Sequence, residues 1–61
     1  MNYEVIIEHT ENGKHHSTVR SCDNAHVQTH WDKLKEYASA GDILTLRERD
    51  TGMTLVTESI G

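Results

Sequence analysis

The sequence contains no proline and only one cysteine, Cys22, and both absences narrow what the chain can be. A single cysteine excludes a disulfide within the chain, and a lone thiol favours a reducing compartment. With 61 residues, the chain is expected to form one small domain, residues 1–61. Domains of this size bury little surface and usually need a metal or a partner subunit when disulfides are missing. Metal binding and self-association are therefore the two hypotheses to compare.

The sequence also lacks a long hydrophobic run and an excess of basic residues. No apolar stretch approaches the roughly 20 residues of a membrane span. The sequence has no basic segment followed by an apolar run, so a signal peptide is not expected. Ten acidic residues against six basic ones give a net charge of −4, which disfavours binding to the phosphate backbone of DNA or RNA. We therefore expect a cytoplasmic protein that binds neither a membrane nor bulk nucleic acid.

Residues 3–21 predict a β-hairpin. The segment YEVIIEH, residues 3–9, is rich in β-branched residues, and Asn12-Gly13 is the dipeptide most typical of a two-residue type I′ turn. The second strand then covers about residues 14–21. Counting outward from the turn gives these pairs: Glu11 with Lys14, Thr10 with His15, His9 with His16, Ile7 with Thr18, Ile6 with Val19 and Val5 with Arg20. Because His9 and His16 would face each other, we expect stability to fall below about pH 6.5, where both become charged.

The middle of the chain predicts an amphipathic helix. Asp23 or Asn24 can cap its first turn. Apolar residues then recur at helical spacing, at Val27, Trp31, Leu34 and Ala38, with Tyr37 beside them. Gly41 follows, where a left-handed residue commonly ends a helix. We expect a helix of about 16 residues that ends in the small-residue run 38–40.

Two further strands are expected at Asp42–Arg49 and Met53–Ile60, joined by a turn that contains Gly52. A three-residue connection would pair Arg49 with Met53. A four-residue connection would pair Glu48 with Met53 and Leu46 with Leu55. We favour the second, because it gathers these leucines and the methionine on one face of the sheet.

The element order ββαββ predicts an α+β fold, a four-stranded antiparallel sheet with one helix packed on one face. The first strand lies beside the third, or the second beside the fourth, and the sequence leaves both orders open. The covered face is expected to hold Tyr3, Val5, Ile7, Leu44, Leu46, Met53 and Leu55.

The opposite face of the sheet is expected to carry four aliphatic residues: Ile6, Val19, Ile43 and Val56. Isolated β-branched residues suit exposed strands and need no further explanation. An apolar centre with a polar rim, however, is typical of a protein interface. Because so small a core favours a partner, we interpret this face as the contact of a homodimer or a higher oligomer. Pairing between strand edges is a second route to the same assembly.

Cys22, His26 and His30 follow one another at intervals of four residues and are the candidate metal ligands. Two histidines four residues apart on a helix can approach one ion, and zinc is the metal that such a set would suit. Against this, structural zinc sites generally use ligand pairs on two elements, often with more than one cysteine. Polar helix residues without a ligand role are therefore the favoured interpretation, and no cofactor is expected.

Catalysis is not expected either. Cys22 near a helix start could be a nucleophile with His26 as its base. A chain of this length offers little room for a pocket that excludes water and orients a third group. We therefore do not expect an enzyme.

Basic side chains form the candidate anion site: Arg20, Arg47, Arg49, Lys14 and His16. The planar guanidinium of arginine suits carboxylates and phosphates. In an acidic chain such a group fits a compact anion, for example a nucleotide or a cyclic dinucleotide bound across a dimer axis, as a phage or bacterial protein that sequesters such a signal would need. Ordinary cross-strand charge pairs are the alternative.

The sequence thus favours a small, non-enzymatic, oligomeric binding or regulatory protein that acts through protein–protein contacts. A small anionic ligand is the alternative, and a histidine-based metal site comes third.

Overall fold

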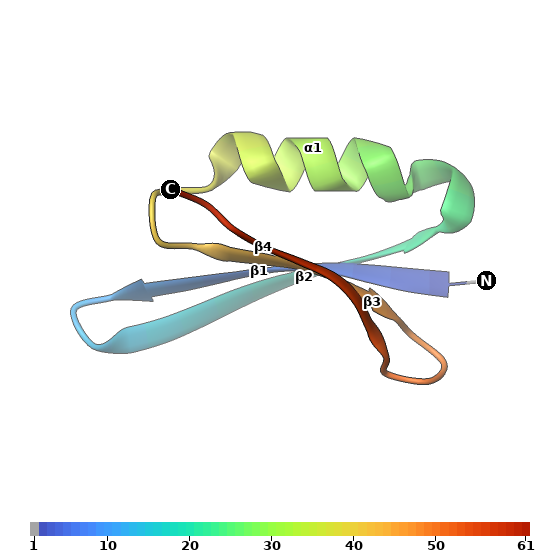
Figure 1. Ribbon diagram of the computed structural model, residues 1–61, viewed down its shortest axis with the longest axis horizontal. Coiled ribbons are helices and arrows are strands. Elements are labelled where there is room, and N and C mark those ends of the chain that lie inside the picture. Colours follow the sequence, from blue (N-terminus) through green and yellow to red (C-terminus); the bar gives the residue numbers. More distant parts are fainter. Residues whose placement is uncertain (1) are drawn as a thin grey trace.

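The computed structural model describes residues 2–61. The elements are β1 (Asn2–Glu11), β2 (Lys14–Asp23), a short 3₁₀ helix η1 (Asn24–His26), α1 (Val27–Tyr37), β3 (Ile43–Glu48) and β4 (Thr54–Ser59). This order confirms the predicted ββαββ arrangement and the α+β class. In Figure 1, α1 lies across one face of the sheet, and the hairpin formed by β1 and β2 extends past the end of the helix.

The four strands form one sheet in the order β2-β1-β3-β4, and all neighbouring strands are antiparallel. The structure therefore selects the arrangement in which the first strand lies beside the third. β1 and β3 are interior strands, whereas β2 and β4 form the two edges. This choice determines which backbone groups remain without a strand partner.

The β1–β2 hairpin has the register that the sequence predicts. Glu11 lies opposite Lys14, His9 opposite His16 and Val5 opposite Arg20. The turn residues Asn12 and Gly13 have φ angles of 52° and 78°, as a type I′ turn requires. The strands are longer than expected, because the pairing continues to Asn2 and Asp23.

The helix is shorter than predicted. Its entry is a 3₁₀ turn capped by Asp23, whose carboxylate accepts a hydrogen bond from the His26 backbone N–H at 3.2 Å. Its end lies at Tyr37 rather than in the run 38–40, because Ala38 is extended with ψ of 148°. The Asp42 carboxylate accepts a hydrogen bond from the Ser39 backbone N–H at 2.9 Å. This side-chain bond offers the backbone an alternative to helical hydrogen bonding.

The core between α1 and the sheet is small. Val5 and Leu44 are fully buried, and Leu34 of α1 packs on them. Five partly buried residues surround this cluster: Ile7, Cys22, Trp31, Leu46 and Ile60. The apolar stripe of the helix therefore covers the sheet face that carries the odd-numbered residues of β1, as predicted.

The pairing of β4 agrees with the prediction beside the turn, where the Glu48 N–H donates to the Met53 carbonyl at 2.8 Å, and differs from it further along the strand. Leu46 lies opposite Val56 and Arg47 opposite Thr54, with an irregularity between these two pairs that is typical of a β-bulge. The expected pair of Leu46 with Leu55 is therefore wrong. The extra residue turns Val56 toward the helix, where it lines a small hollow with Val27 and Trp31.

Met53 and Leu55 were expected in the core, but they are 59% and 45% exposed. Met53 precedes β4, whereas Leu55 is the residue that the irregularity leaves without an opposite partner. Glu58 lies opposite Leu44, on the helix side, and forms an ion pair with Lys35 of α1 at 2.9 Å.

Within residues 2–61, no helix is both long enough and apolar enough to cross a membrane.

Candidate functional site

The outer face of the sheet, opposite α1, carries three of the four expected aliphatic residues. Ile6 lies opposite Val19 on one side and Thr45 on the other, and Ile43 lies opposite Glu8. Val56 does not belong to this face, because it pairs with Leu46 on the helix side. Ile6 is only 7% exposed, whereas Val19 and Ile43 are 44% and 37% exposed. The exposed apolar surface is thus smaller than the sequence suggested.

The free edge of β2 is the second exposed feature. The two residues that flank a two-residue hairpin turn form backbone hydrogen bonds with each other. The Glu11–Lys14 pair is therefore hydrogen-bonded, and so is every second pair along the hairpin. The carbonyl of Asn2 accepts a hydrogen bond from the Arg49 N–H at 3.0 Å. This bond fits the alternation, because the backbone groups of even-numbered residues of β1 point toward β3. The backbone groups of β2 that point away from β1 therefore belong to His15, Ser17, Val19, Ser21 and Asp23.

This edge is long and regular. All ten residues of β2 are exposed except Cys22, which is partly buried. Its pairing with β1 runs without a register shift, and the chain has no proline that could interrupt it. The other edge strand, β4, has six residues and contains the bulge. Proline, bulges and short length are three of the means that block an edge against pairing, and β2 has none of these three. Of the further means, charged side chains, it has Lys14 at one end and Arg20.

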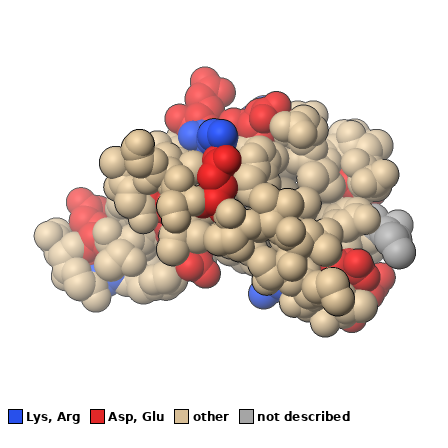
Figure 2. All heavy atoms as spheres, in the orientation of Figure 1, with Lys and Arg blue, Asp and Glu red and all other residues tan. Residues whose placement is uncertain are grey.

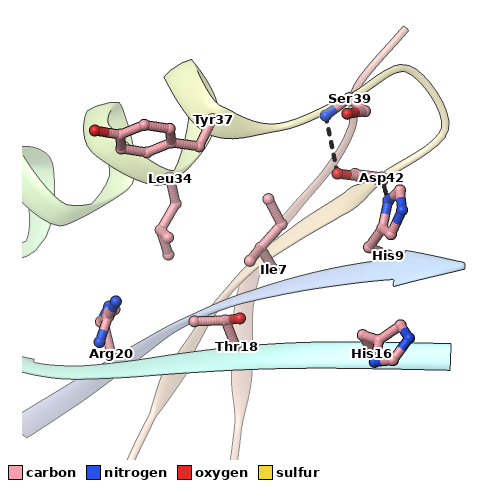
Figure 3. A pocket seen from close by; sticks show the side chains of 9 residues that line it. All are labelled: Ile7, His9, His16, Thr18, Arg20, Leu34, Tyr37, Ser39 and Asp42. Atoms are coloured by element: carbon pink, nitrogen blue, oxygen red, sulfur yellow. Dashed lines mark hydrogen bonds and ion pairs between the residues drawn. The ribbon is translucent and has the colours of Figure 1, made fainter.

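A groove lies between the hairpin and the C-terminal half of α1. Its volume is about 390 Å³, and its lining residues are Ile7, His9, His16, Thr18, Arg20, Leu34, Tyr37, Ser39 and Asp42. Figure 3 shows the side chains of β2 below, those of α1 above and the Asp42 loop closing one end. The groove is open on one side and is of the size that small-molecule sites commonly have.

The β2 wall of the groove presents unpaired polar groups. His16, Thr18 and Arg20 alternate with outward-facing residues and so share the helix-covered face. Within the part of the chain that the structure describes, the side chains of Arg20 and His16 take part in no hydrogen bond or ion pair, although their backbones pair with β1. An exposed guanidinium beside a hydroxyl and an imidazole can bind a small anion.

The end of the groove beside the Asp42 loop holds a paired acid and base. Nδ1 of His9 lies 2.6 Å from Oδ1 of Asp42, and the other carboxylate oxygen accepts the Ser39 N–H. The hydrogen bond from Ser39 and the contact with His9 lower the pKa of Asp42. The hydrogen bond with Asp42 in turn raises the pKa of His9, and Glu11 adds to this shift. A neighbouring carboxylate of this kind favours the charged form of His9.

The structure does not gather the predicted basic cluster. Arg47 lies on the outer face, where Nη2 and Nε bond to Oε1 of Glu4 at 2.9 and 3.2 Å. Arg49 follows β3, and Lys14 lies beside the hairpin turn. Only Arg20 and His16 of the predicted set line the groove. On the face drawn in Figure 2, the Lys and Arg side chains are few and stand among acidic groups.

The predicted metal ligands lie on three different elements. Cys22 belongs to β2, His26 to the 3₁₀ turn and His30 to α1, so they do not follow one helical face. Nδ1 of His26 lies 2.6 Å from the Asp23 carboxylate, which lowers the pKa of Asp23. Within residues 2–61, no group of three or more His, Cys, Asp or Glu side chains is placed to hold a metal ion.

The environment of Cys22 does not activate its thiol. Burial raises the pKa of Cys22, and the negative charge of Asp23 adds to the effect. A raised pKa lowers the thiolate fraction, and the thiolate is the nucleophilic form.

Comparison of the chain with protein-family models, with curated proteins and with solved structures finds no match. The functional argument therefore rests on the chemistry of the groove and of the β2 edge.

Sequence reasoning missed three polar groove residues: Thr18, Ser39 and Asp42. Asp42 carries a recognisable signal, because a serine three residues earlier and Gly41 between them are typical of a side-chain-stabilised turn. Its contact with His9 has no such signal, since 33 residues separate the two.

Proposed function

We propose that the protein is a non-enzymatic binding module that acts through protein–protein contacts and works as a homodimer or a higher oligomer in the cytoplasm. The observation that carries this proposal is the free edge of β2, a regular strand with exposed backbone groups on one side. A strand of another chain can add to such an edge, because the backbone hydrogen bonds supply affinity and alternate side chains supply specificity.

Two exposed aliphatic residues support the same proposal. Val19 lies in β2 itself, and Ile43 lies on the outer face at the start of β3. Contact at the β2 edge would bury Val19, whereas contact through the sheet face would bury both residues. The small core between α1 and the sheet agrees with a chain that gains stability from a partner.

Native mass spectrometry on untagged protein over a range of concentrations tests the proposal. We expect a dimer or larger species, and Val19→Glu should weaken it at least about tenfold, equivalent to about 1.4 kcal/mol. Ile43→Glu is the matched control. If it leaves the assembly intact, the contact is the edge, and if it also splits the assembly, the contact includes the face. A monomer at every concentration would contradict the proposal.

A small anionic ligand is the second candidate function, and unpaired Arg20 in the groove supports it. The relevant basic residues are Arg20 and His16, because Arg47 is already engaged by Glu4. Thr18 adds a hydroxyl donor, and the exposed ring of Tyr37 offers a stacking surface at the rim.

Titration with inorganic pyrophosphate, followed by NMR or calorimetry, tests this second function. Arg20→Ala should weaken binding at least about tenfold, because it removes the guanidinium that faces the groove. Arg49→Ala, which removes the same charge outside the groove, should leave binding unchanged. Equal effects of the two substitutions would show that net charge rather than the groove binds the anion.

A further inference from the structure

We propose that the free edge of β2 pairs with β2 of a second copy of this chain, antiparallel and centred on Val19, so that the two sheets become one. This inference rests on the proposed function and names its partner. It differs from a contact between sheet faces, because the backbone of β2 makes it.

The geometry of antiparallel pairing restricts how two copies can meet. Directly opposite residues in such a pair have their side chains on the same face of the sheet. A two-fold axis that relates the copies therefore stands perpendicular to the sheet and passes beside one residue of β2, which then faces its own counterpart. Both copies of α1 lie on the same side of the joined sheet.

Centring the pair on Val19 uses every outward-pointing residue of the edge. Val19 faces Val19 of the second copy, Ser17 faces Ser21, and His15 faces Asp23. All of these residues direct their backbone N–H and C=O groups away from β1, so each pair can exchange hydrogen bonds. On the outer face, the valine pair forms an apolar centre, with a pair of small serines on each side of it. At each end, the basic His15 of one strand faces the acidic Asp23 of the other.

The neighbouring registers are less complementary. Centring on Arg20 would place two guanidinium groups directly opposite each other, which is destabilising in a strand pair. Centring on Thr18 would place Arg20 opposite His16, and Asp23 would extend past the end of the partner strand. The Val19 register instead places Arg20 opposite Thr18 and His16 opposite Cys22. Avoidance of an opposed Arg20 pair and of an Arg20–His16 pair therefore favours the Val19 register.

The same register changes the groove. Thr18 and Arg20 line the groove. In the pair, Thr18 of one copy would lie opposite Arg20 of the other, and Arg20 opposite Thr18. The two grooves then adjoin across the axis, with one arginine from each chain. A dimer would thus supply two guanidinium groups to a single cleft, where one chain supplies one.

Disulfide trapping with the native Cys22 tests both the partner and the register. Opposite residues of a non-hydrogen-bonded pair have Cα atoms about 4.5 Å apart, within reach of a disulfide. Three single variants sample the proposed register and its two neighbours: Lys14→Cys for a centre at Thr18, His16→Cys for a centre at Val19 and Thr18→Cys for a centre at Arg20. Within one chain these positions lie at least about 13 Å from Cys22 along the extended strand, so any disulfide joins two molecules.

We expect mild oxidation to give a covalent dimer from His16→Cys, with a yield at least tenfold above that of the other two variants. The double variant His16→Cys with Cys22→Ser should give none, because position 16 faces position 22 rather than itself. Non-reducing electrophoresis and intact mass measure the yield.

The contrary outcomes separate this inference from the proposed function. A native dimer that cross-links best through Lys14→Cys or Thr18→Cys overturns the register. A native dimer that no variant cross-links overturns pairing through the β2 edge in these three registers but leaves an oligomeric binding protein. A native monomer that no variant cross-links overturns both.

Discussion

At the scale of single residues, Asp42 holds together parts of the chain that are distant in sequence. Its side chain is 7% exposed, and both carboxylate oxygens have partners, the Ser39 N–H and His9. It thereby fixes the loop after α1 and attaches that loop to the end of β1. A buried carboxylate is stable only when it is paired and hydrogen-bonded in this way.

This pairing reverses the pH dependence expected from the sequence. His9 and His16 do face each other, but His9 contacts Asp42, which raises the His9 pKa. A raised folded-state pKa contributes stability that is complete below the unfolded value of about 6.5 and is lost as the pH rises through the folded value. Asp42 acts in the opposite range, because its lowered pKa contributes stability that is lost only as the pH falls below about 3.8.

We therefore predict that the free energy of unfolding decreases as the pH rises above about 6.5. His9→Gln should flatten this decrease, because it removes the titrating group. His15→Gln, which removes a histidine that does not contact Asp42, should leave the decrease in place. Urea denaturation across this pH range measures both effects. Stability that rises with pH in the wild type would contradict the assignment.

At the scale of elements, the β1–β2 hairpin is set by its turn. The positive φ angles of Asn12 and Gly13 place both residues where a side chain is disfavoured, and glycine is the residue that accepts this conformation without strain. The turn fixes the register, and the register decides which side chains of β2 face the groove and which backbone groups face outward. The candidate site therefore depends on two residues that do not touch it.

We predict that Gly13→Ala lowers stability by about 1 kcal/mol, because a Cβ is strained at a φ of 78° although nothing lies within 4 Å of it. Gly61→Ala, at a glycine without positive φ, should change stability by much less. Thermal and urea unfolding measure the difference. An equal effect of the two substitutions would show that the turn is not strained by a side chain.

The bulge in β4 is the second feature at this scale. It adds one residue between the Leu46 and Arg47 pairs and so exchanges the faces of the residues that follow. Val56 joins the helix side, and Leu55 remains exposed. The bulge also makes β4 a poorer edge for pairing than β2.

At the scale of the whole molecule, stability rests on few residues. The buried cluster under α1 consists of Val5, Leu34 and Leu44, and much of β2 and β4 is exposed. A domain with so small a core has little stability to lose. Burial of the β2 edge against a partner would add to it, and this relates the proposed assembly to folding as well as to function.

We predict that Leu44→Ala lowers the free energy of unfolding by about 3 kcal/mol, since it leaves a cavity at a fully buried site. Leu55→Ala, at a position 45% exposed, should cost less than about 1 kcal/mol. The comparison distinguishes the observed β4 register from the one expected, in which both leucines would be buried. Denaturant unfolding at one fixed protein concentration measures it, and equal losses would favour the expected register.

The sequence by itself determined the local features of this protein. The β-branched run before Asn12-Gly13 specified the first hairpin and its register, and the spacing of Val27, Trp31 and Leu34 specified the helix face. The element order then implied an α+β sheet with one covered face. These features follow from contacts between residues close in sequence, for which short-range backbone preferences and periodicity are sufficient.

Only the tertiary structure decided the strand order, the bulge and the site. The place of β1 beside β3 depends on packing between segments that no local signal relates, and the bulge lies in the pairing of β4 with β3. The same packing separates Arg47 from Arg20, joins His9 to Asp42 and leaves the β2 edge free. These are long-range outcomes, because each depends on which side chains the whole sheet brings together rather than on the preference of any one segment.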